Sequence, residues 1–146
     1  MAKIEESVLI NRSVGDVWKF INDISKVPTW DSDVLELRLT SEGPMGVGTT
    51  GEFRAKMRNM TILIRVTEYE PDRRISFEHL SGPMKGSIIT FSVEPVEGKT
   101  RFTNINDLKL SGLYKLVGPL MIPSMRRGVV TGLCNAKRML ESEGQK

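Results

Sequence analysis

The chain of 146 residues has the size of one domain, so we expect a single domain over residues 1–146. Hydrophobic residues make up 39% and charged residues 27% of the sequence, which is ordinary globular usage and excludes intrinsic disorder. The 21 Lys and Arg only slightly outnumber the 18 Asp and Glu and are scattered, so we expect no nucleic-acid partner.

The first expected elements are a strand and two short helices. Residues 3–12 combine β-branched and charged side chains, which is typical of a strand. Apolar residues at helical spacing predict a helix over 14–21 with one buried face. A second short helix is expected over 23–27, because Pro28 disfavours helical geometry in the residue before it. Trp30 then lies just beyond that helix.

The middle of the chain changes to the period of two that marks strands. Turn signals rich in Gly and Pro divide it into six segments. The predicted strands lie near residues 32–41, 49–58, 60–70, 73–81, 85–96 and 100–110. Because the links are short, consecutive strands are expected to be antiparallel neighbours.

The last segment returns to the period of a helix. Residues 123–143 carry an apolar stripe with most basic residues off it, which predicts a long amphipathic helix. Residues 113–123 are apolar and interrupted by Gly and Pro, and we expect a loop there that gates a cavity or touches a membrane surface. The alternative is a packed lead-in helix. A seven-stranded antiparallel sheet with one long helix indicates an α+β fold in which the sheet curves around the helix.

Short segments in this order carry a resemblance to a known superfamily. They are Ser-Val-Gly-Asp-Val-Trp at 13–18, Ile-Asn-Asp at 21–23 with Pro-Thr-Trp at 28–30, and the stretches 69–75, 98–103 and 133–141. Together they resemble the polyketide cyclase/dehydrase-like branch of the START-like (SRPBCC) superfamily, over essentially the whole chain. The resemblance implies the helix-grip fold, with two short helices after the first strand and a cavity between sheet and long helix. It also implies an apolar small molecule in that cavity, but it does not fix an activity, because members range from lipid carriers to aromatase/cyclases.

The side chains expected on the cavity wall come from the inward faces of these elements. They are Trp30, Phe53, Met57, Ile64, Phe77, His79, Phe91, Asn104, Met121, Met125, Val129 and Leu133. His79 is the candidate catalytic residue, because it titrates near neutrality and shares strand parity with Ile75 and Phe77. The alternative is a partly solvated histidine near a strand end.

Other chemical groups have open or structural interpretations. In the last strand, either Asn104 or its neighbour Thr103 faces inward, since one bulge reverses the parity. Arg54 and Arg65 are expected to point outward, because an unpaired buried charge is costly. The acid pairs Asp31/Asp33 and Glu68/Glu70 are interpreted as solvated carboxylates. These pairs do not have the spacing of a glycosidase site.

The single cysteine and single histidine limit the chemistry further. Cys134 is expected to be a buried structural thiol, and neither an internal disulfide nor a histidine cluster is possible. We therefore expect no metal and no cofactor. The longest apolar runs are far shorter than a membrane span, and the acidic N-terminal residues are unlike a signal peptide. A cytoplasmic location without an integral membrane segment is expected.

The leading hypothesis is a protein that binds an apolar or amphipathic small molecule, lipid-like or polyketide-like, between the sheet and the long helix. The first alternative is an aromatase/cyclase or dehydratase-type enzyme that uses His79 and polar groups of the last strand. The second is a protein-interaction module. A homodimer is a further expectation that the sequence leaves open.

Overall fold

The computed structural model describes residues 2–143. Its elements in chain order are β1 (Ala2–Ile10), α1 (Val14–Asn22), η1 (Ile24–Lys26), α2 (Val27–Trp30), β2 (Val34–Leu39), β3 (Thr50–Ala55), η2 (Met57–Asn59), β4 (Thr61–Glu70), β5 (Arg74–His79), β6 (Ile88–Val96), β7 (Lys99–Leu108) and α3 (Leu113–Glu143). The η elements are single 3₁₀ turns. The seven strands were all predicted, and each observed strand lies within a few residues of its predicted limits.

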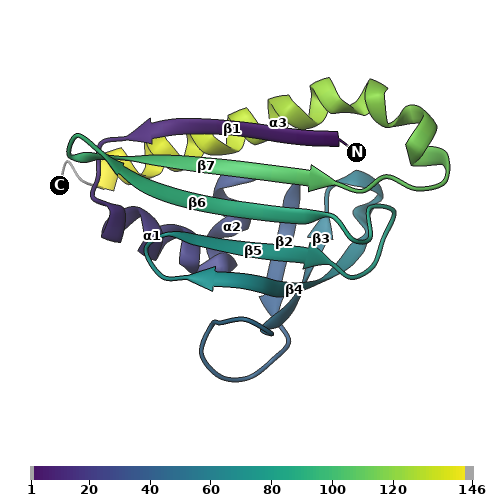
Figure 1. Cartoon of the computed structure of the whole chain (residues 1–146), viewed down its shortest axis with the longest axis horizontal. Coiled ribbons are helices and arrows are strands. Elements are labelled where there is room, and N and C mark those ends of the chain that lie inside the picture. Colours follow the sequence, from purple (N-terminus) through teal and green to yellow (C-terminus); the bar gives the residue numbers. More distant parts are fainter. Residues whose placement is uncertain (1, 144–146) are drawn as a thin grey trace.

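The strands form one antiparallel sheet in the order β1-β7-β6-β5-β4-β3-β2. Figure 1 shows the sheet bending, so that β2 and β3 run across the direction of β6 and β7, while α3 lies alongside β1. The predicted α+β architecture, a curved sheet around a long helix, is confirmed. The bend matters for function, because it holds the inner sheet face away from α3.

The two short helices close one end of the curved sheet. Ser13 caps α1 by accepting a hydrogen bond from the Asp16 backbone N–H at 3.2 Å, and the helix buries a face that includes Trp18 and Ile21. The predicted end of the second helix at Val27 is wrong. Pro28 instead occupies the first turn of α2, where its missing N–H costs nothing, so Trp30 is the last helical residue.

Helix α3 is longer than the sequence predicts. The loop expected over 113–123 is wrong, because α3 begins at Leu113 and contains Pro119 and Pro123. The alternative, a lead-in helix, is confirmed, but the helix is only partly packed, since Leu113 and Leu120 are exposed. Each proline removes one helical hydrogen bond, but both side chains are exposed and Gly118 on the opposite face is buried against Leu110. Figure 1 shows α3, in green, changing direction over its first turns.

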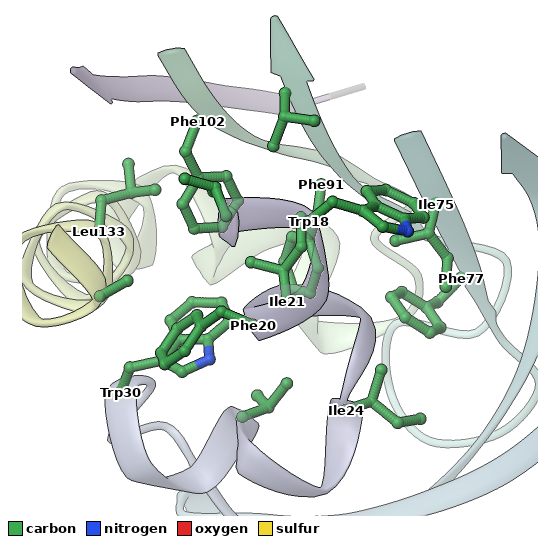
Figure 2. Packing of buried hydrophobic residues seen from close by; sticks show 14 of the residues in the cluster. Trp18, Phe20, Ile21, Ile24, Trp30, Ile75, Phe77, Phe91, Phe102 and Leu133 are labelled. Carbon is green, nitrogen blue, oxygen red and sulfur yellow. The ribbon is translucent and has the colours of Figure 1, made fainter. Parts of the chain in front are cut away.

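The apolar interior is divided into two clusters. The larger lies between α1, α2, the C-terminal half of α3 and the sheet, and Figure 2 shows Trp30 and Leu133 among its packed aromatic and aliphatic side chains. The indole of Trp30 meets Phe91 and Phe102 edge-on, with ring centroids 5.4 and 5.7 Å apart. The smaller cluster has Ile4, Met84 and Leu108 at its centre.

The outer surface corrects one prediction and confirms another. Arg54 and Arg65 point outward and pair with Glu36 and Glu78 on neighbouring strands, at 3.3 and 2.9 Å. Cys134 is exposed, so the predicted buried thiol is wrong. The reason is geometric, since Leu133 occupies the inner face of α3 and the next residue is turned by about 100° away from the sheet.

Candidate ligand-binding cavity

A cavity of about 790 Å³ lies between the two apolar clusters. Strands β2 to β7 form its wall and α3 closes it, so the curvature of the sheet creates the space. Most lining side chains are aliphatic, aromatic or methionine, with a few polar groups among them. This combination is typical of small-molecule sites, which are concave, mainly apolar and of this size.

Most of the side chains predicted for the cavity wall line it. They are Phe53, Met57, Ile64, Phe77, His79, Phe91, Asn104, Met121, Met125 and Val129. Trp30 and Leu133 do not line it. They are 1% and 2% exposed and fill the larger cluster beside the cavity, because α2 carries the indole ring toward Phe102 and α3 carries Leu133 into the same layer.

His79 lines this cavity, and one of its ring nitrogens has no hydrogen-bond partner within residues 2–143. Its ring lies beside that of Phe53, with centroids 5.5 Å apart, and the backbone N–H and C=O are bonded to Ser87 and Gly86. Nδ1 is buried and accepts or donates no hydrogen bond within residues 2–143. Burial lowers the pKa of His79 from 6.5 to about 4, so the imidazole is neutral at physiological pH.

The last strand turns its amides toward the cavity. Asn104 is 4% exposed and lies on the same face as Phe102 and Leu108, which settles the parity that the sequence left open. Asn106, two residues on, donates from Nδ2 to Oδ1 of Asn104 at 2.7 Å, and both line the cavity. Each side-chain amide has more donors and acceptors than this one bond uses, so the pair can bind a polar group of a ligand.

Asp31 and Asp33 line the cavity at the end of α2. Asp33 is exposed, as predicted, whereas Asp31 is partly buried, contrary to the solvated role predicted for it. The Asp33 N–H donates to Oδ1 of Asp31 at 3.0 Å, and the Asp31 N–H donates to the Val27 carbonyl at 2.8 Å, so the loop is held firmly. Burial raises the pKa of Asp31 from 3.8 to about 6, opposed by the Asp33 hydrogen bond and assisted by the Asp33 charge. The sequence offered one signal for the burial of Asp31, which is that it directly follows the buried Trp30.

The exposed lining residues mark where the cavity opens. Leu120 at the start of α3 is 82% exposed, and Met57 in η2 is 37% exposed. Lys56 and Asp33 are also exposed at this rim, and the Lys56 N–H donates to the Asp33 carbonyl at 2.9 Å. These four residues are called the cavity mouth below.

Within residues 2–143, no three His, Cys, Asp or Glu side chains come together in a way that would hold a metal ion. In the same part of the chain, no helix is both long enough and apolar enough to span a membrane.

The curved antiparallel sheet, the long helix and the cavity between them define a helix-grip protein. The chain belongs to the family described as polyketide cyclase/dehydrase and lipid transport, because the model of that family matches residues 1–141. The resemblance seen in the sequence is thereby confirmed.

Solved structures with this fold cover nearly all of the chain. Protein TTHA0849 from Thermus thermophilus superposes with a TM-score of 0.80 at 16% identity, over 97% of this chain and 99% of that one. The Zhui aromatase/cyclase from a Streptomyces species gives a TM-score of 0.75 at 13% identity, over 96% and 93%. The Aha1 dimer from Colwellia psychrerythraea gives 0.69 at 19% identity, over 97% of both chains. At these identities the likeness shows the fold. A comparison with curated protein sequences finds no match.

Proposed function

We propose that this protein binds an apolar or amphipathic small molecule in the cavity between the sheet and α3. The observation that carries the proposal is the cavity itself, about 790 Å³ of space inside the fold with a mainly apolar wall. An apolar molecule that binds to a concave, mainly apolar wall of this size gains packing contacts with it and removes apolar surface from water. Membership of a family described by cyclases, dehydrases and lipid transport supports the same proposal.

The polar groups on the wall define where the polar part of the ligand binds. The imidazole of His79 and the amides of Asn104 and Asn106 lie among apolar side chains of the cavity wall. Buried polar groups need partners, so they favour a ligand with a hydroxyl or carbonyl group over a pure hydrocarbon. The ligand class is therefore a lipid-like or polyketide-like molecule with one polar region.

Native mass spectrometry of the purified protein, followed by denaturing extraction, tests this proposal. We expect a stoichiometric adduct that releases an apolar compound carrying a hydroxyl or carbonyl group. If no adduct is found, the emptied protein is titrated with long-chain fatty alcohols, and failure to bind any of them contradicts the proposal.

Two neighbouring valines of α3 supply a matched pair of variants. Val129 lines the cavity, whereas Val130 is 41% exposed on the outer face. Val129→Trp places a large ring in the cavity and should weaken binding by about tenfold or more, as expected when ligand contacts are lost. Val130→Trp should bind like the wild type. Equal binding by both folded variants would show that the ligand lies elsewhere.

A second candidate function is catalysis of the cyclase or dehydratase type. Two observations favour it. The imidazole of His79, which lines the cavity, is neutral at physiological pH, and Asp31 on the same cavity has a pKa raised to about 6. Cyclisation and dehydration of a poly-oxo substrate need proton transfers between such groups. His79→Gln keeps a hydrogen-bonding side chain but removes the base. It should leave binding within about threefold and abolish turnover if the protein is an enzyme.

A further inference from the structure

The start of α3 exposes three leucines on one face. Leu113, Leu116 and Leu120 are 66%, 78% and 82% exposed, and their spacing places them side by side on consecutive turns. Single exposed leucines are ordinary, but three adjacent ones form an apolar patch that normally has a partner. We call these three residues the leucine patch. Figure 1 shows this part of α3, in green, at one end of the long axis of the molecule, beyond the end of β7.

The charges around the leucine patch are all basic along the chain. Residues 108–140 contain six Lys and Arg and no Asp or Glu, although the other residues hold more acids than bases. Lys109 precedes the patch and Lys115 lies within it, and both are exposed. Neither forms an ion pair within residues 2–143. Exposed leucines beside unpaired lysines match the surface of an anionic bilayer, where apolar groups enter the acyl boundary and cations meet acidic headgroups.

The connection between β5 and β6 lies at the same end of the molecule as the leucine patch and carries a further positive charge, Lys85. Lys109 donates its backbone N–H to Ser87 Oγ at 2.8 Å, and Ser111 Oγ donates to the Pro83 carbonyl at 3.5 Å. These bonds hold the connection that carries the exposed Lys85 against the segment leading into α3. The segment that leads into the leucine patch is therefore hydrogen-bonded to a neighbouring connection, which brings a third exposed lysine to this end of the molecule.

The leucine patch is continuous with the cavity mouth. Leu120 belongs to both, and Met121, Ser124 and Met125 continue the cavity lining along the next turn. We propose that the leucine patch inserts into the surface of an anionic membrane, with Lys109 and Lys115 on acidic headgroups, so that the cavity mouth faces the lipid layer from which the ligand enters. The entry of a ligand from the membrane rests on the proposed binding function, whereas the docking of the protein on the membrane does not require a ligand.

Vesicle flotation tests the docking step directly. The intact chain is mixed with vesicles of phosphatidylcholine containing roughly a quarter phosphatidylglycerol, and separately with phosphatidylcholine alone. We expect binding to the anionic vesicles that weakens as salt is raised, because salt screens the headgroup charges. Lys115→Gln should weaken binding by about fivefold, the effect of one lysine near such a surface.

The leucines have a matched control on the sheet. Leu113→Gln combined with Leu116→Gln changes exposed residues that do not line the cavity, and we expect a loss of vesicle binding of about tenfold or more. Leu35→Gln combined with Leu63→Gln changes two exposed leucines of β2 and β4 and should leave vesicle binding unchanged. Equal binding by all three proteins overturns the proposal. The proposal is also overturned if the wild type binds no vesicles and instead forms a homodimer that the Leu113 and Leu116 substitutions dissociate.

The Val129→Trp variant separates this inference from the proposed function. It should float with anionic vesicles as the wild type does, yet its affinity for a long-chain fatty alcohol carried in those vesicles should be weaker by about tenfold or more. A protein that binds ligand but no vesicle disproves the docking inference alone. A protein that binds vesicles through the leucine patch but takes up no ligand disproves the binding function alone.

Discussion

Asp31 and His79 line the same cavity and change their proton affinity in opposite directions on folding. The pKa of Asp31 rises from 3.8 to about 6, so the folded protein holds a proton that the unfolded chain releases, and stability falls as pH rises through this range. The pKa of His79 falls from 6.5 to about 4, so the unfolded chain binds the extra proton and stability rises with pH. Between about pH 4 and 6 the two effects oppose each other, and together they leave little dependence on pH.

Single substitutions should expose each effect. Asp31→Asn keeps the oxygen that accepts the Asp33 N–H but no longer titrates, so the effect of His79 is unopposed. The unfolding free energy of this variant should therefore rise by about 1–2 kcal/mol from pH 4 to 6.5. In His79→Gln the effect of Asp31 is unopposed, so the unfolding free energy of this variant should fall by a similar amount from pH 4 to 6. Urea unfolding followed at several pH values measures both slopes.

Asp33 provides a graded comparison for this experiment. Its charge helps to raise the pKa of Asp31, so Asp33→Asn should change the pH profile in the same direction as Asp31→Asn, but by less. Parallel profiles for the Asp31 and His79 variants would contradict the opposing linkage.

At the scale of elements, the hairpin of β2 and β3 depends on one close backbone approach. Gly51 in β3 pairs with Leu39, and a Cβ built on it would lie only 2.9 Å from the Arg38 carbonyl oxygen. The neighbour is backbone, which cannot move without disturbing the register that places Phe53 on the cavity wall. This strand pair therefore holds one side of the cavity in place.

Gly51→Ala should destabilise the protein by about 1–3 kcal/mol, the usual cost of forcing a tightly packed contact apart. Gly15→Ala in α1 is the matched control, because a Cβ there meets nothing within 4 Å. That change should stabilise the protein by up to about 1 kcal/mol through helix propensity. Chemical denaturation measures both, and a neutral Gly51→Ala would contradict the close approach.

The elements also show where sequence patterns were sufficient. The strands and the antiparallel order of β2 to β7 were predictable, because alternation and short turns are local signals, whereas the pairing of β1 with β7 joins the two ends of the sheet sequence and was not predicted. The start of α3 was not predictable either, since Pro119 and Pro123 indicate a break in the helix by local rules, yet the helix continues through both and packs Gly118 against Leu110 of a separate segment. For the same reason Asp31 was misjudged and Trp30 was assigned to the cavity. Their surroundings come from distant strands and from α3.

At the scale of the whole molecule, the cavity divides what is usually one continuous core. Ile62, Phe77 and Phe91 belong to the larger cluster and Met84 and Leu108 to the smaller, and all five face the space between them. The fold is completed around that space by β1 and β7, which pack along α3. Neither cluster encloses the ligand site alone, so the site exists only when the entire chain is folded.

A divided core should make the protein unusually sensitive to hydrostatic pressure. Unfolding removes the poorly packed apolar space, so the unfolded chain with its hydration occupies less volume, and pressure favours it in proportion to the space lost. Val129→Trp, which fills part of the cavity, should unfold at higher pressure than Val130→Trp, as followed by tryptophan fluorescence. Identical pressure midpoints would contradict this. Under the binding function proposed above, a bound apolar molecule should raise the unfolding pressure of the wild-type protein, because less poorly packed volume is then lost on unfolding.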